Sequence, residues 1–245
     1  MIVVILGLAP KTGKTTVAVN LAVNRAHRKE AVTILDCEPD TAAEDWQKMR
    51  HRFGFDVGEV PKDACQIDVV AVSGDDVKDA IDKAKPDYDH IIIDVGAQNK
   101  KAMRSALLVA DSLYTPIQLP KIYGDMLMFE LAEIVRQGRG ENPRLRAYAF
   151  DNRSIFVGKT DKEDIAETVD LVSHFSGFIS DWPIHKHEIF KQSSRIGLGI
   201  NEIPIIGEDS EIRDRLRARD ELAVLENHIF QDEPFMYPKG HIQNH

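Results

Sequence analysis

The sequence is short of cysteine, of net positive charge and of long apolar segments. Its two cysteines, Cys37 and Cys65, are too few for a disulfide framework or a complete set of metal ligands in 245 residues. A reducing cytoplasm is therefore the expected compartment. The chain carries 31 basic and 40 acidic residues, a net charge of −9. Any contact with nucleic acid has to come from a local basic patch.

No segment reaches the roughly 18 consecutive apolar residues that a membrane-spanning helix needs. The apolar stretch Met1–Leu8 lacks a preceding basic region and is soon followed by Lys11, so no export signal is expected. Internal repeats and low-complexity tracts are also missing. Because 43% of the residues are hydrophobic, the core is sizeable, and we expect one domain over residues 1–231 and an irregular tail over 232–245.

Short β-branched runs alternate with helical patterns along the chain. The predicted strands are Ile2–Leu6, Val32–Leu35, Ile67–Val72, His90–Ile93, Ser112–Pro116, Arg146–Phe150 and Gly177–Ser180. The predicted helices are Thr15–Arg28, Ala42–Arg52, Asp76–Ala84, Lys100–Val109, Asp125–Arg136, Lys162–His174 and Ile212–Ile229. Gln137–Pro143, rich in glycine and proline, is expected to be a connecting loop. The alternation predicts an α/β fold, a mostly parallel doubly wound sheet with helices on both faces.

A segment with the composition of a phosphate-binding loop follows the first predicted strand. It reads Gly7-Leu-Ala-Pro-Lys-Thr-Gly-Lys-Thr-Thr16. In its Gly13-Lys14-Thr15 end, the glycine lets the backbone approach phosphates, the lysine reaches the β/γ-oxygens, and the threonine hydroxyl can ligate Mg²⁺. The opening is irregular, because Leu8 stands where a P-loop has its first glycine. A chance Gly-Lys-Thr in a strand-to-helix turn is the alternative, and the flanking strand and helix favour a nucleotide site.

Two later strands end in carboxylates. The strand Val32–Leu35 is followed by Asp36-Cys-Glu-Pro-Asp40, and the apolar run His90–Ile93 is followed by Asp94. An apolar strand that ends in aspartate beside a P-loop strand has the Walker B form, and acids at this edge can hold Mg²⁺ through water or orient an attacking water. For the first run alone, a solvated acidic turn is the better interpretation. The three motifs in this order favour a nucleotide site.

The order of motifs resembles the deviant-Walker ATPases of the ParA/MinD group, most of all the short ParA-type plasmid partition proteins. The family's Lys-Gly-Gly-x-Gly-Lys-Thr-Thr and Asp-x-Asp-Pro-Gln correspond to Ala9-Pro-Lys-Thr-Gly-Lys-Thr-Thr16 and Asp36-Cys-Glu-Pro-Asp40. Asn152-Arg153 stands where the family has its adenine-contacting pair, and Gly197–Glu202 resembles a later family segment. The similarity spans most of residues 1–230. It implies a P-loop NTPase of the SIMIBI/ParA-like kind.

The resemblance implies an ATP- and Mg²⁺-dependent homodimer that binds DNA without sequence preference and works with a centromere-binding or cargo adaptor. Lys14 stabilises phosphate charge, Glu38 or Asp40 positions the attacking water, and Lys11 supplies a cation to the partner's nucleotide. The implied metal residues are Thr15, Asp36 and Asp94. The implied nucleotide contacts are Pro10, Lys11, Thr12, Gly13, Lys14, Thr15, Thr16, Asn152 and Arg153. The location is cytoplasmic, with possible nucleoid association.

The chain departs from the family pattern at two positions. The family's signature lysine falls at Ala9, so Lys11, Lys121 or Arg153 would have to replace it. The second acid of Asp-x-Asp is Glu38, whose extra methylene displaces the carboxylate by about one C–C bond, and small misplacements cost much rate. Slow hydrolysis is therefore predicted.

Some branches of the group are excluded by composition. Two cysteines are too few for a chain-internal four-thiolate iron–sulfur site. The segment Asp232–His245 has one lysine and no helical apolar stripe, whereas a membrane-docking relative ends in a basic amphipathic helix. No membrane partner is expected.

The candidate DNA-binding residues are Lys186, Lys191 and Arg195, grouped with His185 and His187. Contacts from lysine and arginine to phosphate are the sequence-independent part of DNA affinity, and a solvated helix face is the alternative. A second basic cluster, Arg213, Arg215, Arg217 and Arg219, is interleaved with acids. Its spacing fits a helix held by i,i+4 ion pairs better than a DNA stripe.

Two other functions stay open. One is an ATP-dependent small-molecule ligase of the dethiobiotin-synthetase type, for which Lys121 and Lys159 are the only candidate pocket residues. The other is a nucleotide-binding module without hydrolysis, suggested by the irregular loop.

Overall fold

The strands form one seven-stranded parallel sheet in the order β3-β2-β4-β1-β5-β6-β7. The computed structural model describes residues 1–54, 67–74, 76–117, 125–154 and 177–231. The strands are β1 (Ile2–Gly7), β2 (Val32–Asp36), β3 (Asp68–Ala71), β4 (His90–Gly96), β5 (Ser112–Ile117), β6 (Arg146–Ser154) and β7 (Gly177–His185). The predicted parallel α/β fold is confirmed, with β1 at the centre.

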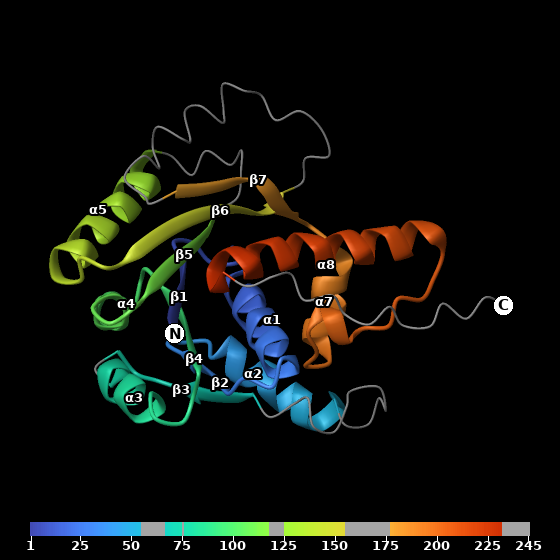
Figure 1. Cartoon of the computed structure of the whole chain (residues 1–245), viewed down its shortest axis with the longest axis horizontal. Helices are drawn as coiled ribbons and strands as arrows, with labels where there is room; N and C mark the ends of the chain where they lie inside the picture. The colour runs from blue at the N-terminus through green and yellow to red at the C-terminus, as the bar shows by residue number, and fades with distance from the viewer. Residues whose placement is uncertain (55–66, 75, 118–124, 155–176, 232–245) are drawn as a thin grey trace.

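Helices cover both faces of the sheet (Figure 1). One face carries α3 (Val77–Ala84), α4 (Lys100–Leu107) and α5 (Asp125–Glu141), and the other carries α1 (Lys14–His27), α2 (Ala42–Met49) and α8 (Asp209–Phe230). The π-helical turn η1 (Arg50–Gly54) follows α2, and α7 (Glu188–Arg195) and the 3-10 turn η2 (Ile200–Glu202) precede α8. The predicted helix Lys162–His174 and the tail 232–245 lie outside the described residues.

The central strand explains why the N-terminal run is continuously apolar. Ile2, Val4 and Leu6 pack into the core against α3, α4 and α5, whereas Val3 and Ile5 pack against α1 and α8. Successive side chains of a strand point to opposite faces, so a strand covered on both sides needs apolar residues throughout. The first predicted strand is therefore a buried element of the sheet.

The loop predicted over Gln137–Pro143 is wrong, because α5 continues to Glu141. Gly138 is a site of close packing: a Cβ there would lie 3.1 Å from Leu145 Cδ2 and 3.4 Å from Leu107 Cδ1. Asn142 then ends the helix, donating from Nδ2 to the carbonyl oxygens of Leu107 and Ala110 at 2.9 and 2.8 Å. Tertiary packing has outweighed the low helix propensity of glycine.

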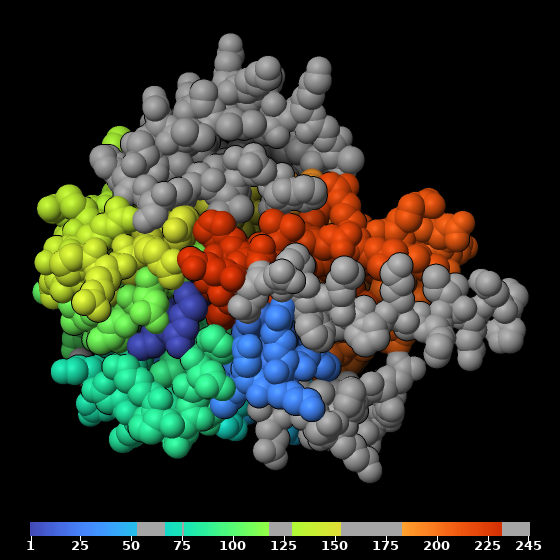
Figure 2. Space-filling view, viewed as in Figure 1, coloured from blue at the N-terminus to red at the C-terminus, as the bar shows by residue number. Residues whose placement is uncertain are grey.

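The helix α8 runs along the exterior beside α1, and Figure 2 shows it exposed across this face. At the contact, the buried Glu226 carboxylate accepts from Asn24 Nδ2 at 2.6 Å and from Arg25 Nε at 3.1 Å. The Arg25 guanidinium lies 4.2 Å from the centre of the Phe230 ring. Both oxygens of this buried acid are thus bonded to α1.

A second buried ion pair joins η1 to η2. Arg50 donates to both oxygens of Glu202, at 2.8 and 2.7 Å, and the Gly199 N–H donates at 2.8 Å. His27 lies 3.0 Å away. Burial alone would raise the pKa of Glu202, but Arg50 and His27 outweigh it and lower this pKa to about 2. The segment Gly197–Glu202 is held in place by these bonds.

Within the described parts of the chain, no helix combines the length and the apolar character that crossing a membrane requires.

Candidate nucleotide site

The loop between β1 and α1 has the backbone shape of an anion site. Gly13 adopts a left-handed conformation, φ 89°, immediately before α1, and the Gly13 N-cap has no side chain to cap the first turn of the helix. The Thr12 hydroxyl donates to the Ala9 carbonyl at 3.3 Å within the loop. Because the first N–H groups of a helix have no intrahelical acceptor and carry the positive end of the dipole, they can bind a phosphate.

Two paired glycines make room for the charged groups of the site. Gly7 and Gly96 are register partners on β1 and β4. A Cβ on Gly7 would lie 2.7 Å from Lys14 Cδ, and one on Gly96 would lie 2.5 Å from Glu38 Oε1. Gly7, one residue early for a regular P-loop, thus gives space to the lysine side chain.

Lys14 and Glu38 form an ion pair over these glycines. Lys14 Nζ lies 3.0 Å from Glu38 Oε2, with 12% and 15% of the two side chains exposed. Burial alone would lower the pKa of the Lys14 ammonium, but Asp94 and Glu38 outweigh it and raise this pKa above 10.5. The lysine is therefore charged and held by the glutamate that replaces the family's second aspartate.

Asp94 is a fully buried carboxyl group at the tip of β4. Neither of its oxygens has a hydrogen-bond partner among the residues that the structure describes, and Glu38 Oε1 has none either. Burial raises the pKa of Asp94 to about 7, and the nearby Asp36 and Glu38 charges add to this, against the influence of Lys14. A buried carboxyl group without partners is costly in a fold.

Asp36 lies opposite Asp94 in the strand register, but its environment differs. Its Oδ1 accepts from the Glu38 N–H at 3.1 Å, and its Oδ2 accepts from the Ala43 and Glu44 N–H groups at 2.8 and 3.2 Å. These bonds oppose the burial that raises the pKa of Asp36. The carboxylate of Asp36 fastens the turn that carries Glu38, so it positions the site in this form of the protein.

The remaining predicted site residues differ in exposure. Thr15 and Thr16 lie half-buried in the first turn of α1. The Thr15 hydroxyl is near enough to Asp94 to lower that group's pKa without forming a regular hydrogen bond to it. Pro10 and Lys11 are exposed, with Lys11 at φ 63°, and Asp40 is exposed in the turn after β2.

Asn152 connects β6 to the phosphate loop. Its side chain is 4% exposed, and Nδ2 donates to the Thr12 carbonyl at 2.6 Å. The structure thus places Asn152 against the phosphate loop with its amide bonded to backbone, and its predicted contact with adenine stays a prediction. Arg153 follows it on β6, and its side chain lies outside the described residues, as do Lys121 and Lys159.

Sequence reasoning missed Asn99, which joins two strand tips. Its Oδ1 accepts from the Ala102 N–H at 3.3 Å and so caps the start of α4, and its Nδ2 donates to the Cys37 carbonyl at 2.9 Å. Asparagine directly before a helical pattern is an N-cap signal. That signal could have located the cap, but not the bond to Cys37, 62 residues away.

Lys186, Lys191 and Arg195 are exposed on and before α7, and Lys191 pairs with Glu188 at 3.3 Å. Grouping His185 and His187 with them is wrong, because both imidazoles bond to Glu221 on α8. In the second basic cluster, Arg217 forms the expected i,i+4 pair with Glu221 at 2.8 Å. Arg215 and Arg219 instead donate to backbone carbonyls before α8.

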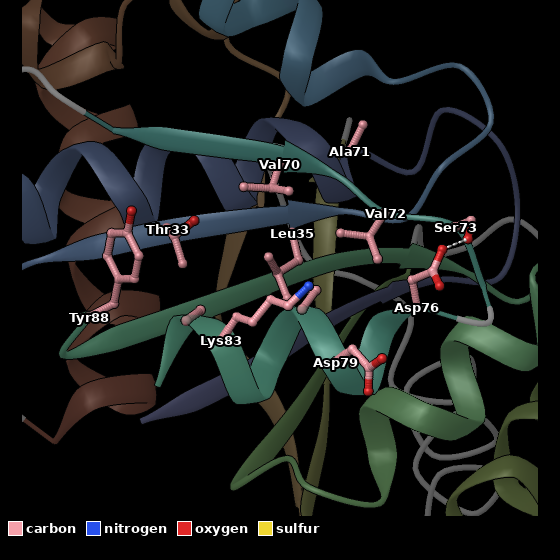
Figure 3. A pocket seen from close by; sticks show the side chains of 12 residues that line it. Thr33, Leu35, Val70, Ala71, Val72, Ser73, Asp76, Asp79, Lys83 and Tyr88 are labelled. Atoms are coloured by element: carbon pink, nitrogen blue, oxygen red, sulfur yellow. Dashed lines mark hydrogen bonds between the residues drawn. The ribbon is translucent and has the colours of Figure 1, made fainter. Parts of the chain in front are cut away.

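A separate cavity of about 430 Å³ lies at the edge of the sheet, between β2, β3 and α3 (Figure 3). Its lining includes Leu35, Val70 and Lys83. No residue of the phosphate loop lines it, so this cavity is distinct from the nucleotide site.

The donor set at the strand tips suits Mg²⁺. Asp36, Glu38 and Asp94 lie near the Lys14 ammonium, and three carboxylate oxygens of Glu38 and Asp94 have no hydrogen-bond partner in the described part of the chain. Hard carboxylate and hydroxyl oxygens are the groups that hold this ion or its waters beside a nucleotide. The unpartnered oxygens therefore fit a divalent cation better than they fit a purely structural role.

Solved structures with the same fold come from several bacteria. They include MinD of Aquifex aeolicus, with TM-score 0.62, 15% identity and coverage of 97% of this chain and 99% of that one. Apo McdA of Cyanothece has TM-score 0.59, 16% identity and coverage of 90% and 98%. A ParA-family ATPase of Chlorobium tepidum has TM-score 0.58, 16% identity and coverage of 90% and 98%. No curated protein matched the sequence significantly.

The sequence model of the family described as ATPase MipZ matches residues 2–128. This span contains the phosphate loop, both acidic strand tips and the glycine pair. The chain therefore belongs to the MipZ ATPase family and is a ParA/MinD-type P-loop ATPase.

Proposed function

We propose that this protein is a nucleotide-dependent switch, in which ATP and Mg²⁺ drive formation of a homodimer and slow hydrolysis returns it to monomers. The observation that supports this most is the buried Asp94 carboxyl group, which has no hydrogen-bond partner among the residues described and lies near the charged Lys14 at the start of α1. Such an arrangement is costly unless a ligand completes it. Mg²⁺ bound to a phosphate would satisfy both groups, because the cation would pair with the Asp94 carboxylate and the phosphate would pair with the Lys14 ammonium.

In this proposal, Lys14 and the N–H groups at the start of α1 stabilise the charge of the β/γ-phosphates. Thr15 and Asp94 hold Mg²⁺ or its waters, while Asp36 maintains the turn that carries Glu38. Bound Mg²⁺ would neutralise phosphate charge during transfer. Glu38 or Asp40 orients the attacking water, and Lys11 serves the partner's nucleotide across the dimer.

The Lys14–Glu38 pair suggests why hydrolysis would be slow. Lys14 has to leave Glu38 before it can meet a phosphate, and the longer Glu38 side chain has to reach a water position that aspartate serves in the family. Both requirements reduce the fraction of complexes with the productive geometry. A binding module without hydrolysis is the limiting case of the same arrangement.

The switch is tested by light scattering of the full chain with ATP, ADP or no nucleotide, in the presence of Mg²⁺. We expect a dimer with ATP alone, and a monomer under every condition for Lys14→Ala. Calorimetry measures the affinity for ATP separately. We expect Lys14→Ala to weaken this affinity by about 100-fold, because hydrogen bonds to charged groups contribute about 1.5–3 kcal/mol. A mass that ATP leaves unchanged in a protein that binds it would reject the switch and leave a nucleotide-binding module.

We further propose that the ATP-bound dimer binds DNA without sequence preference through Lys186, Lys191 and Arg195, and serves DNA segregation or cargo positioning with an adaptor. The three side chains are exposed, and lysine and arginine contacts to phosphate need no base recognition. A cytoplasmic, nucleoid-associated location follows from this role.

A gel-shift series at increasing salt tests the DNA contact. Replacing the three residues with alanine should lower the slope of log affinity against log salt by up to about three, because each phosphate contact contributes about 0.9. The matched control replaces the exposed Lys48, Lys85 and Arg136 with the same loss of charge. Equal effects of the two triple variants would reject a specific surface on α7.

A further inference from the structure

Two imidazoles and a carboxylate from three elements meet next to α8. His185 ends β7, His187 directly precedes α7, and Glu221 lies on α8. One donor atom from each lies within 4.8 Å of the others. Glu221 and His187 are buried, and the His185 side chain is 11% exposed. The P-loop and the acidic strand tips lie on other elements, so this cluster is separate from the nucleotide site.

Both imidazoles point at the same carboxylate. His185 Nδ1 lies 2.7 Å from Glu221 Oε1, and His187 Nε2 lies 2.8 Å from Glu221 Oε2. Two ligands of a single tetrahedral ion are about 3.3 Å apart, given metal–nitrogen and metal–oxygen bonds of about 2.0–2.1 Å. Each of the two imidazole–carboxylate distances would need to lengthen by only about half an ångström to admit an ion.

An outer carboxylate orients one of the imidazoles. His187 Nδ1 lies 2.6 Å from Asp214 Oδ1 on α8, leaving Nε2 directed at Glu221. This is the arrangement in which a metal-binding histidine donates its other ring N–H to a carboxylate, which fixes the tautomer and strengthens the ligand.

Arg217 opposes a metal at this position. Its Nε donates to Glu221 Oε1 at 2.8 Å, and Nη2 lies 3.2 Å from the His185 ring. The side chain is 47% exposed, so it can turn into solvent and expose the carboxylate oxygen. The cationic group lowers the affinity for a cation without blocking the ligands.

We infer that His185, His187 and Glu221 form a binding site for a divalent transition metal, with Asp214 as the outer partner of His187. Imidazole nitrogen with one carboxylate oxygen is a donor set typical of zinc and its neighbours in the first transition row. A bound ion would fasten the end of β7 and the start of α7 to α8.

The test is calorimetric titration of Zn²⁺ into nucleotide-free full-length protein that has been stripped of metal. The tail histidines are replaced, His241→Gln and His245→Gln, and excess Mg²⁺ is present to compete for the carboxylates of the nucleotide site, so that one Zn²⁺ per chain reports on the cluster. A parallel Co²⁺ titration is followed by visible absorption, which reports coordination geometry. We expect one ion per chain and a raised melting temperature, because binding to the folded state alone stabilises it.

Four variants make the assignment specific. His187→Gln should abolish Zn²⁺ binding, Asp214→Ala should weaken it by about 10- to 100-fold, and Arg217→Ala should strengthen it. His27→Gln is the matched control, because His27 pairs with the buried Glu202 in a cluster that lacks a second histidine, and it should leave binding unchanged. Circular dichroism verifies that each variant is folded.

Three results would overturn the site. These are no uptake of Zn²⁺ by the wild-type protein at millimolar concentration, equal Zn²⁺ binding in His187→Gln, and weaker Zn²⁺ binding in Arg217→Ala. Each would make the cluster a hydrogen-bonded clamp between β7 and α8 and nothing more. None of these results bears on ATP binding, which the Lys14→Ala experiment examines separately.

Discussion

Two buried carboxyl groups of this protein differ in how well they are satisfied. Glu202, at the end of η2, accepts bonds from Arg50 and the Gly199 N–H, and its pKa falls to about 2. Asp94, at the tip of β4, has no hydrogen-bond partner among the described residues, and its pKa rises to about 7. Both carboxyl groups are buried to a similar degree, so their partners decide whether the pKa rises or falls. A fully paired acid holds the fold together, whereas an unpaired one is available to a ligand.

Removing the partner of the paired acid should have the largest effect on stability. Arg50→Met removes the guanidinium that pairs with the buried Glu202 charge, and loss of one member of a buried pair costs about 3–5 kcal/mol. Urea denaturation measures this change in the free energy of unfolding. Arg136→Met is the control, because Arg136 is 73% exposed and pairs with Glu133 on the surface, where a pair contributes at most about 1 kcal/mol. A loss below 1 kcal/mol for Arg50→Met would remove the distinction between the two acids.

Asp94 should make the nucleotide-free protein less stable as pH rises. Its pKa of about 7 in the folded state exceeds the value of about 3.9 in the unfolded state, so the folded protein binds more protons between pH 4 and 7. Stability should therefore decline across this window, by on the order of 3 kcal/mol. Asp94→Asn should remove most of this decline in the free energy of unfolding and give a more stable protein at pH 7. The affinity of this variant for ATP should no longer depend on Mg²⁺. The control Asp40→Asn alters an exposed acid, and an equal change there would contradict the assignment.

Urea denaturation below pH 4.5 tests the paired acid, Glu202, in the same way. The pKa of Glu202 is lowered to about 2 in the folded protein. Its contribution to the free energy of unfolding is therefore present above the unfolded-state pKa and is lost as pH falls from about 4.5 toward 2. Glu202→Gln should remove that acid-side loss and leave the decline between pH 4 and 7 intact. The two variants should therefore act on separate limbs of one pH profile.

The sequence predicts the sheet well because the signals for it are local. Apolar runs such as Ile91–Ile93 and the Gly13-Lys14-Thr15 turn carry their meaning within a few residues. What it could not provide are the partners across the fold. Arg50 and Glu202 are 152 residues apart, and the burial of His187 depends on Glu221, 34 residues later. Helix α5 likewise extends past Gly138 because of Leu107 and Leu145, which no local propensity reports.

Glu38→Asp should raise ATP hydrolysis by about tenfold. The shorter side chain withdraws from Lys14, which lies 3.0 Å from Glu38 Oε2, and restores the acid found in the family at this position. Displacements of about 1 Å at a reacting centre can change rates up to about 100-fold. Phosphate release under single-turnover conditions measures the step. Glu38→Gln separates the two causes, because it frees Lys14 without an acid, and a rate increase there would show that the ion pair alone limits hydrolysis.

The smallest effect is expected from Asn152, which tests how far the site depends on a single bond from the sheet. Asn152→Ala removes the donor to the Thr12 carbonyl and should cost about 1 kcal/mol of stability, the usual contribution of one hydrogen bond. Asn142→Ala is a matched control, since its amide also donates to backbone carbonyls, those of Leu107 and Ala110. Both variants should lose similar stability in urea, but only Asn152→Ala should weaken ATP binding, by about fivefold. Because Thr12 borders Gly13 at the helix start, a loosened Thr12 carbonyl disorders the N–H groups that would meet the phosphates. Equal ATP affinity of the two variants would mean that the loop keeps its shape without the sheet.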